Sequence, residues 1–283
     1  MKLINSSFEI IEQKPGLEGL YKQIEMAGRT CYKSESNITE DSAKAFVDRM
    51  IKSGHGAMLE HGTVYLAIPM TTYAPDAVNF YYDNPYSKVN ECNDFIFKDK
   101  YGNEVAAWCV TTNFRVLVEN NLLEDLEFLC EPTEYHEKRV TVRFICDRGV
   151  SHEFVRHRVS SFAQESTRYC NYIKDKFGGS VTFIIPPWLQ ESEELEYEED
   201  LKIIESLYFK WLNKGWTAQQ ARGFLCHFLK TELVMTGFID DWKHFFLLRS
   251  SIALSGKPHP QAEELAQPLM IEFINKGYME SIT

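Results

Sequence analysis

A dense group of arginines in an acidic chain constrains this sequence more than any other feature. Arg156, Arg158 and Arg168 place three permanent cations within thirteen residues of a protein whose formal net charge is -11. Arginine stays charged in proteins and offers a planar set of donors that matches carboxylate and phosphate. The fold must therefore set these cations beside carboxylates or present them to a bound anion. Glu153 and Glu165 flank the group and supply the first alternative, an ordinary ion-paired surface.

The bulk properties indicate a folded globular protein. With 283 residues, 44% of them hydrophobic and 13% aromatic, the chain is long enough for one large domain or two small ones with a sizeable core. The pI near 5.3 argues against nucleic acid as the partner, because binding to its phosphate backbone requires a broad basic face. A basic pocket for a small anion is still compatible with this charge.

Targeting signals and cysteine usage point to the cytoplasm. The N-terminus lacks the apolar segment of a signal peptide, and no run approaches the length of a membrane helix, so we expect no membrane partner. The seven cysteines are odd in number and widely spread, and they include no C-x-x-C pair. This pattern favours reduced thiols over a disulfide framework or a zinc site.

The periodicity of apolar residues predicts a mixture of helices and strands. We expect helices at about 17–26, 42–52, 104–119, 191–212, 217–228 and 261–275, and strands at about 63–68, 139–146, 181–185 and 233–239. Ser151 could begin a short helix through Val155, and Asp240 or Asp241 could cap one that ends near Arg249. The sum is an α+β protein with a modest, mainly antiparallel sheet and helices packed against it.

Several common site motifs are absent from the sequence. There is neither a G-x-G-x-x-G after a strand nor a P-loop. His152-Glu153 followed by His157 superficially suggests a zinc protease, but these histidines are five residues apart, whereas a zinc pair on one helix face needs a spacing of four. We therefore predict no metal site. No cysteine has a neighbouring base in the sequence, so a cysteine nucleophile also lacks support.

The arginine run carries a longer pattern. Arg156-His157-Arg158 is followed after seven residues by Ser166 and then by Arg168-Tyr169. This spacing resembles the signature of the flavin-dependent thymidylate synthases. The resemblance implies reductive methylation of dUMP to dTMP, with methylenetetrahydrofolate as carbon donor and NADPH as reductant through FAD. It covers about 1–70 and 139–283 of a single domain, and 71–138 is an unassigned insertion.

The resemblance also assigns roles to individual residues. It makes Arg249 the catalytic group, which polarises the uracil ring. It predicts nucleotide contacts from Glu153, Arg156, Gln164, Glu165, Ser166, Thr167, Arg168, Arg222 and Arg249. It predicts flavin contacts from His61, Thr63, Arg156, His157, Arg158, Gln164 and His244. Members of the family are homotetramers with sites shared between chains, and we expect the same assembly here.

Local geometry refines these assignments. In extended or turn backbone, Arg156 and Arg158 point the same way and His157 points opposite. Ser166 looks like a nucleophile from its place in the motif, but the sequence gives it no base, so we predict an orienting role. Ala163-Gln164 stands where the family often has Asn-Glu. Asp240 replaces an expected flavin contact, and because an anion would repel a pyrophosphate, we predict that it caps a helix instead.

Two rival functions remain open. One is a non-catalytic flavin- or nucleotide-binding homologue that kept the pocket and lost turnover, which Ala163-Gln164 and Asp240 would explain. The other is a metal-dependent hydrolase built on His55, His152 and His157.

Overall fold

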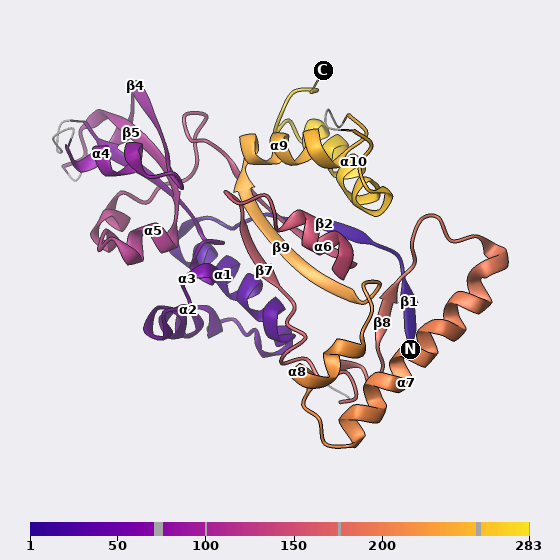
Figure 1. The fold of residues 1–283 in the computed structure, drawn as a ribbon. Helices are drawn as coiled ribbons and strands as arrows, with labels where there is room; N and C mark the ends of the chain where they lie inside the picture. The colour runs from indigo at the N-terminus through magenta and orange to yellow at the C-terminus, as the bar shows by residue number, and fades with distance from the viewer. Residues whose placement is uncertain (71–75, 100, 175–176, 253–255, 283) are drawn as a thin grey trace.

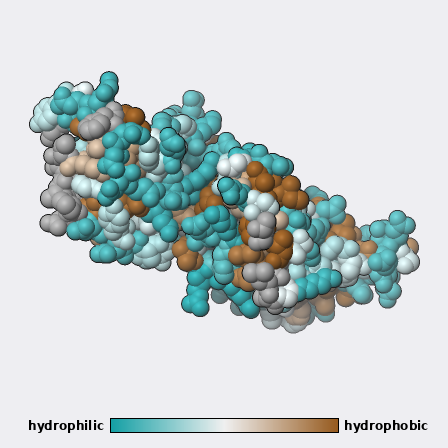
Figure 2. All heavy atoms as spheres, turned by 90° about the horizontal axis from the view of Figure 1, so that it is seen from above, coloured by the Kyte–Doolittle hydropathy of each residue, from teal (hydrophilic) through white to brown (hydrophobic). Residues whose placement is uncertain are grey.

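Among the residues that the structure describes, the strands form three sheets, and helices cover them (Figure 1). Hydrophilic residues cover much of the face seen from above, with hydrophobic ones between them (Figure 2). In the computed structural model, residues 1–70, 76–99, 101–174, 177–252 and 256–282 are described. A four-stranded sheet has the order β2-β6-β9-β7, a three-stranded sheet the order β3-β5-β4, and β1 pairs with β8. The strands are β1 Lys2–Ile4, β2 Ser7–Ile11, β3 Thr63–Pro69, β4 Lys88–Lys98, β5 Glu104–Asn113, β6 Arg139–Asp147, β7 Ser161–Gln164, β8 Thr182–Ile184 and β9 Lys230–Phe238.

The helices connect these strands. They are α1 Gly16–Tyr32, α2 Ser42–Ser53, α3 Gly56–Leu59, α4 Asp76–Asp83, α5 Phe114–Glu119, α6 Arg148–Phe154, α7 Glu194–Asn213, α8 Ala218–Ala221, α9 Ile239–Arg249 and α10 Pro260–Asn275, with short 3-10 turns η1 Glu35–Asn37, η2 Leu123–Phe128, η4 Glu191–Glu193 and η5 Arg222–Phe224. The predicted α+β class is therefore confirmed. Within the described ranges, none of these helices is both long and apolar enough to cross a membrane.

The four-stranded sheet is buried on both faces. β6 and β9 pair antiparallel from Arg139↔Phe238 to Asp147↔Lys230. Along β9, Leu233 joins the apolar cluster that α9 and α10 cover, whereas Val234 packs with Ala27 of α1 on the opposite face. Figure 1 shows α1 and α10 on opposite sides of β9. β6 could be predicted from the sequence because apolar Val140, Val142 and Phe144 alternate along it.

Residues 71–138 build most of a second sheet, and the helix predicted at 104–119 is wrong over most of its length. Glu104–Asn113 forms the central strand β5, which pairs with β3 on one side and β4 on the other. β-branched residues such as Val110, Thr111 and Thr112 favour this state. Only the last six residues of the stretch are helical, and the Asn113 side chain caps them by accepting the Val116 N–H at 3.2 Å. Apolar side chains of this sheet, α1 and α2 pack together in a separate cluster.

Other predictions failed where local hydrogen bonding or pairing overrode helical periodicity. The helix expected at 217–228 is limited to α8 and η5, because the chain then extends and the Phe228 carbonyl accepts the Ile184 N–H of β8 at 2.9 Å. Asp147, rather than Ser151, caps α6 by accepting the Val150 N–H at 2.7 Å. Strands β1, β2, β4 and β7 were not predicted. The helices at 42–52, 191–212 and 261–275 and the strands at 63–68, 139–146 and 181–185 are confirmed within a few residues.

Candidate functional site

The arginine motif lies on a turn between α6 and β7. The His157 N–H bonds the Phe154 carbonyl at 3.2 Å and the Ser160 N–H bonds the His157 carbonyl at 3.1 Å. His157 is buried, whereas Arg156 and Arg158 are exposed. This is the predicted alternation, with the imidazole directed into the protein and the two guanidinium groups directed out. Neither guanidinium has a carboxylate partner among the described side chains.

Arg249, at the end of α9, reaches the end of α6. Its Nη1 pairs with the Glu153 carboxylate, its Nη2 donates to the Glu153 carbonyl at 3.1 Å, and its Nε donates to His157 Nε2 at 3.3 Å. Burial and then the charges of Arg249 and His244 lower the pKa of His157 to about 4. His157 is therefore neutral at pH 7 and carries its proton on Nδ1. The His244 ring lies 5.8 Å from it.

A second group of polar residues lies where β7 ends. The Ser166 N–H bonds the Cys31 carbonyl of α1 at 2.9 Å, and the Ser166 hydroxyl accepts the Arg168 N–H at 3.3 Å. Arg222 Nη1 donates to Thr167 Oγ1 at 3.3 Å, and Arg168 Nε donates to the Gln219 side chain at 3.0 Å. Both guanidinium groups therefore contact neutral oxygens. Within the described part of the chain, neither forms an ion pair.

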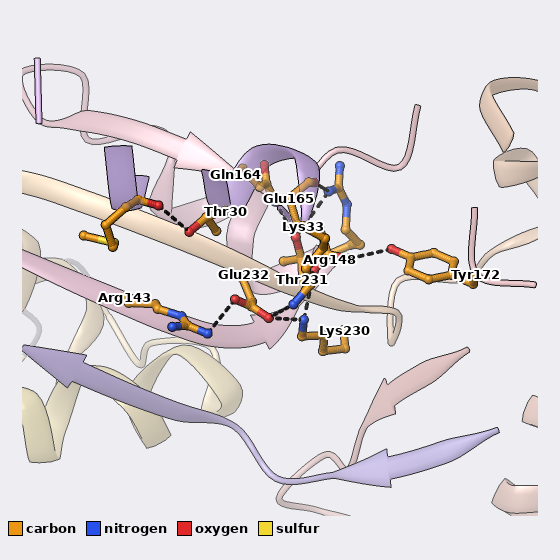
Figure 3. Close-up of polar contacts among 11 residues, drawn as sticks. Thr30, Lys33, Arg143, Arg148, Gln164, Glu165, Tyr172, Lys230, Thr231 and Glu232 are labelled. Carbon is orange, nitrogen blue, oxygen red and sulfur yellow. Dashed lines mark hydrogen bonds and ion pairs between the residues drawn. The ribbon is translucent and has the colours of Figure 1, made fainter. Parts of the chain in front are cut away.

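Glu165 belongs to a buried ion network instead (Figure 3). Its carboxylate accepts Lys230 Nζ at 2.9 Å and the Tyr172 hydroxyl at 2.9 Å. Glu232 pairs with Lys33 and Lys230 through one oxygen and with Arg143 through the other at 2.8 Å. Burial alone would raise the pKa of Glu232, but Lys230 and Lys33 lower it to about 2. The network joins the end of α1, the start of β9 and the end of β7, so it fixes the base of the Ser166 loop.

Gln164, one residue before Glu165, points to the other face of β7. Its amide donates to Ser151 Oγ at 2.8 Å and to Thr231 Oγ1 at 3.3 Å. These bonds tie β7 to α6 and β9. Figure 3 shows Gln164 and Thr231. Both side chains already have partners inside the subunit. The contacts predicted from Gln164 and Glu165 to a ligand stay predictions.

His61 lies against β9, and Thr63 begins β3. His61 is fully buried, its Nδ1 is 2.8 Å from Thr236 Oγ1, and burial followed by the charge of Arg139 lowers its pKa to about 3. The Thr63 N–H bonds the Gln13 side chain at 2.8 Å, and its hydroxyl accepts Arg139 Nη1 at 3.2 Å. Both side chains are therefore hydrogen-bonded inside the subunit. Their predicted flavin contacts are not tested by this geometry.

The predicted residues form two groups rather than one. Glu153, Arg156, His157, Arg158, His244 and Arg249 surround the α6–β7 turn, whereas Ser166, Thr167, Arg168 and Arg222 surround the far end of β7. Ser161 pairs with Thr236 and Gln164 with Leu233, so the strand runs away from the turn. At about 3.3 Å per residue, Ser161 and Ser166 are roughly 17 Å apart.

A match to a family model decides the relationship of the chain to known proteins. The model described as "Thymidylate synthase complementing protein" matches residues 133–275, just over half of the 283 residues. The chain belongs to this family. The match includes the arginine motif, the buried ion network apart from Lys33, and α9. The matched residues therefore include both groups of predicted site residues, whereas His61 and Thr63 lie outside the match.

The curated relatives are named flavin-dependent thymidylate synthases. The one from Pyrococcus furiosus is 36% identical over 107 residues, which are 37% of this chain and 43% of that protein. The one from Pyrococcus horikoshii is 37% identical over 139 residues, 48% of this chain and 55% of that protein. The chain thus spans about half the length of the curated relatives it matches. A crystal structure of a UMP/dUMP methylase, PolB from Streptomyces cacaoi bound with 5-Br dUMP, aligns over 97% of this chain and 93% of that chain at 14% identity, with a TM-score of 0.45.

Two further predictions about this family member concern charge and metal. Asp240 is exposed and pairs with Lys243 at 3.1 Å, whereas Asp241 accepts the Phe238 N–H at 3.0 Å, so Asp241 and not Asp240 caps α9.

The histidines of the rival metal site do not meet. His152 faces His227 at 5.8 Å, His157 contacts Arg249, and His55 precedes α3. No group of three metal-ligating side chains is found in the residues that the structure describes.

The sequence reasoning missed the residues contributed by the end of α1. Tyr32 packs against Tyr169 at 5.1 Å, and Cys31 anchors Ser166.

A cavity of about 410 Å³ adjoins this contact and is lined by Gly28, Cys31, Tyr32, Met50, Gly54, His55, Gly56, Ala57, Met58 and Arg115. Glycine is required at position 28, because an added Cβ would lie 2.5 Å from the Phe46 ring. In Lys230-Thr231-Glu232, the first and last residues place opposite charges on one face of the strand. This pattern was the sequence signal from which the network could have been predicted.

Proposed function

We propose that the protein is a flavin-dependent thymidylate synthase. It methylates dUMP at C5 to give dTMP, with methylenetetrahydrofolate as the carbon donor and NADPH as the reductant through FAD. Membership of the family and the names of the matched relatives support this proposal. We extend it to the whole of residues 1–283 as one domain, in which 71–138 is an insertion.

One structural observation carries the proposal. Arg156, Arg158, Arg168 and Arg222 have no carboxylate partners among the described residues, in a protein of net charge -11. By contrast, Lys33, Lys230 and Arg143 are each paired with glutamate. Unneutralised guanidinium groups on a surface rich in acids are suited to bind phosphate and pyrophosphate, which they can grip through paired N–H donors.

The two groups of residues fit different parts of the ligands. Arg168, Arg222, Ser166 and Thr167 offer cations and hydroxyls at one loop and would hold the nucleotide phosphate. Ser166 has an orienting role, because its hydroxyl already accepts the Arg168 N–H at 3.3 Å. At the other group, Arg249 would donate to a uracil carbonyl and withdraw charge from the ring. Glu153 and neutral His157 hold the Arg249 guanidinium in place for this contact.

The residues at the α6–β7 turn fit a flavin dinucleotide. FAD has an anionic pyrophosphate and a large apolar ring, so it needs unneutralised cations beside an apolar wall. Arg156 and Arg158 supply the cations, while Val155 and Val159 are 37% and 51% exposed next to them. When bound, FAD supplies the hydride that reduces the transferred carbon. The protein contributes charge and orientation around it.

The spacing of the two groups supports a shared site in a homotetramer. The four-residue strand β7 lies between them in one chain, and an extended path from Ser161 to Ser166 would span at most roughly 17 Å. A site that combines the turn of one subunit with the Ser166 loop of another would bring them together. Exposed apolar side chains at the motif, including Tyr169 at 55% and Val159 at 51%, would then be covered by a neighbouring chain.

The proposal has a direct test. The purified protein should be yellow, should bleach anaerobically when NADPH is added, and should release tritium from [5-³H]dUMP when methylenetetrahydrofolate is present. A non-catalytic homologue, which Ala163-Gln164 and Asp240 would favour, binds dUMP but releases no tritium. A colourless protein that binds no added FAD would contradict the flavin proposal itself.

A further inference from the structure

A cavity of about 420 Å³ lies beside the buried ion network. Its volume falls within the range of about 300–1,000 Å³ that is typical of small-molecule sites. The walls come from β1, β8, the start of β9, the residues after α1 and the segment after β7. Of its lining residues, the resemblance assigns a ligand contact only to Glu165, whose carboxylate is bonded to Lys230 and Tyr172. The cavity is therefore formed largely by residues to which no ligand has been assigned.

Strand pairing brings one cation, Lys2, to this cavity. β1 and β8 pair in parallel, with Lys2 beside Thr182. Alternate residues of a strand face the same side, so Lys2 and Ile4 both line the cavity, whereas Leu3 packs against an apolar cluster on the other side. Lys2 is exposed and forms no ion pair within the described ranges. Its ammonium group is therefore available to an anion.

The turn after α1 brings a carboxylate to the same cavity. Lys33 ends α1 in the left-handed conformation, with φ 49°, which is uncommon for a residue other than glycine. The chain then enters η1, and Glu35 and Ser36 of this turn lie on the cavity wall. Glu35 is partly buried, and its carboxylate forms no ion pair with any side chain that the structure describes. It is therefore available to a cation.

The charges around this cavity differ in how they are neutralised. Lys33 and Lys230 pair with Glu232, whereas Lys2 and Glu35 line the same cavity without pairing with each other. The Lys33 side chain is 26% exposed and uses one of its three donors on Glu232, so it can also donate to an anion. The cavity thus offers donors for an anion and a carboxylate for a cation at different points on its wall.

Apolar side chains complete the wall of the cavity. Ile4, Tyr172 and Phe177 contribute them. The Tyr172 hydroxyl is bonded to Glu165 at 2.9 Å, as Figure 3 shows, so the ring is the part of this side chain that a ligand can contact. A multiply charged phosphate is disfavoured, because it would meet the repulsion of the Glu35 and Glu165 carboxylates. A ligand with one charge of each sign and an apolar body fits all of these groups.

We propose that this cavity binds a free α-amino acid with an apolar side chain. The ligand carboxylate accepts hydrogen bonds from Lys2 and Lys33, and its ammonium group pairs with Glu35. Its side chain lies against the apolar wall. The inference does not rest on the proposed synthase activity, because a different ligand and a separate binding measurement test it.

L-Phenylalanine is a suitable probe, and two analogues each lack one of its charges. 3-Phenylpropionate has no ammonium group, and phenylalaninamide has no carboxylate. Calorimetry on the full chain should show millimolar or tighter binding of phenylalanine. Each analogue should bind about tenfold more weakly, because it loses hydrogen bonds between charged groups.

Two variants assign the charges to residues. Lys2→Met and Glu35→Gln should each weaken phenylalanine binding about fivefold. Glu35→Gln should not weaken the binding of 3-phenylpropionate, because this ligand has no ammonium group to lose its partner. Lys52→Met and Glu40→Gln are matched controls, because both residues are exposed and lie outside the cavity lining. They should leave phenylalanine binding unchanged.

Several outcomes would overturn the proposal. They are no phenylalanine binding by the native protein, equal binding of either analogue, or an affinity that both Lys2→Met and Glu35→Gln leave unchanged. Saturating dUMP should not alter the affinity for phenylalanine, and competition between the two would assign the cavity to the nucleotide. A crystal soaked with phenylalanine should show it between Lys2 and Glu35, and a ligand found elsewhere would contradict the assignment. If the protein binds phenylalanine but not dUMP, the proposed synthase function fails and this inference stands.

Discussion

Two clusters of cations in this protein differ in how they are neutralised. At the base of the Ser166 loop, half-buried Lys33 and Lys230 pair with buried Glu165 and Glu232, and every one of these charges has an opposite partner. Around the motif, Arg156, Arg158, Arg168 and Arg222 lack carboxylate partners in the described residues. The first cluster holds three elements of the fold together. The second is available to ligand phosphates, so pairing with carboxylates distinguishes these two clusters. Arg249 stands outside this comparison, because it is paired with Glu153 and the proposed function gives it a ligand contact.

The largest effect is expected from breaking the paired cluster. Glu232→Gln leaves Lys33 and Lys230 buried with too little negative charge, and removal of one partner of a buried ion pair costs about 3–5 kcal/mol. Denaturant unfolding at pH 7 should show this loss of stability. Glu198→Gln is the control, because Glu198 pairs with Lys202 on the exposed surface of α7 and its loss should cost below about 1 kcal/mol. Equal effects would show that the network is not structural.

Acid should weaken the same cluster. The pKa of Glu232 is about 2 in the folded protein, below the value of 4.5 for an unperturbed glutamate. Its charge therefore stabilises the fold above about pH 4.5, and this contribution of a few kcal/mol is lost as the pH falls from 4.5 to about 2. Unfolding free energies measured across this window should fall less steeply for Glu232→Gln than for the native protein. Parallel curves would contradict the assignment.

The unpaired cluster should respond in activity rather than in stability. Arg168→Met removes a phosphate contact and should lower kcat/KM for dUMP about a hundredfold, or about 3 kcal/mol, with little change in the melting temperature. Steady-state tritium release and thermal unfolding measure the two quantities. A variant that loses stability but keeps its kcat/KM would place Arg168 with the structural cations.

Ser166→Ala should give the smallest effect. If Ser166 orients Arg168 and the nucleotide, turnover should fall about tenfold, the loss of roughly one hydrogen bond to a charged group. If Ser166 is instead a nucleophile, turnover should disappear while dUMP binding stays intact. Single-turnover kinetics with bound dUMP distinguish the two results.

The sequence predicted the elements whose pattern is local and missed those that depend on distant pairing. β6 alternates Val140, Val142 and Phe144 with polar residues, and the alternation of Arg156, His157 and Arg158 follows from turn geometry. β5 was predicted as a helix because its partners β3 and β4 are far away in sequence. The ion network was also missed, since Lys33, Glu165 and Glu232 meet only when α1, β7 and β9 pack together.

The site shows the same division. The motif located the cations, but the sequence did not reveal which of them are neutralised. Glu153 pairs with Arg249 and Glu165 with Lys230, so neither flanking acid neutralises Arg156 or Arg158. That assignment requires the direction of each side chain, which spacing alone does not provide.

A comparison of two arginine variants tests the central claim most directly. Arg222 has no carboxylate partner in the described chain, whereas Arg143 pairs with Glu232 at 2.8 Å. Calorimetric titration with dUMP should show at least tenfold weaker binding for Arg222→Met, with an unchanged melting temperature. Arg143→Met should bind dUMP normally and melt at a lower temperature. If Arg222→Met binds dUMP as the native protein does, or if Arg143→Met is the variant that loses affinity, pairing state does not separate the two kinds of charge.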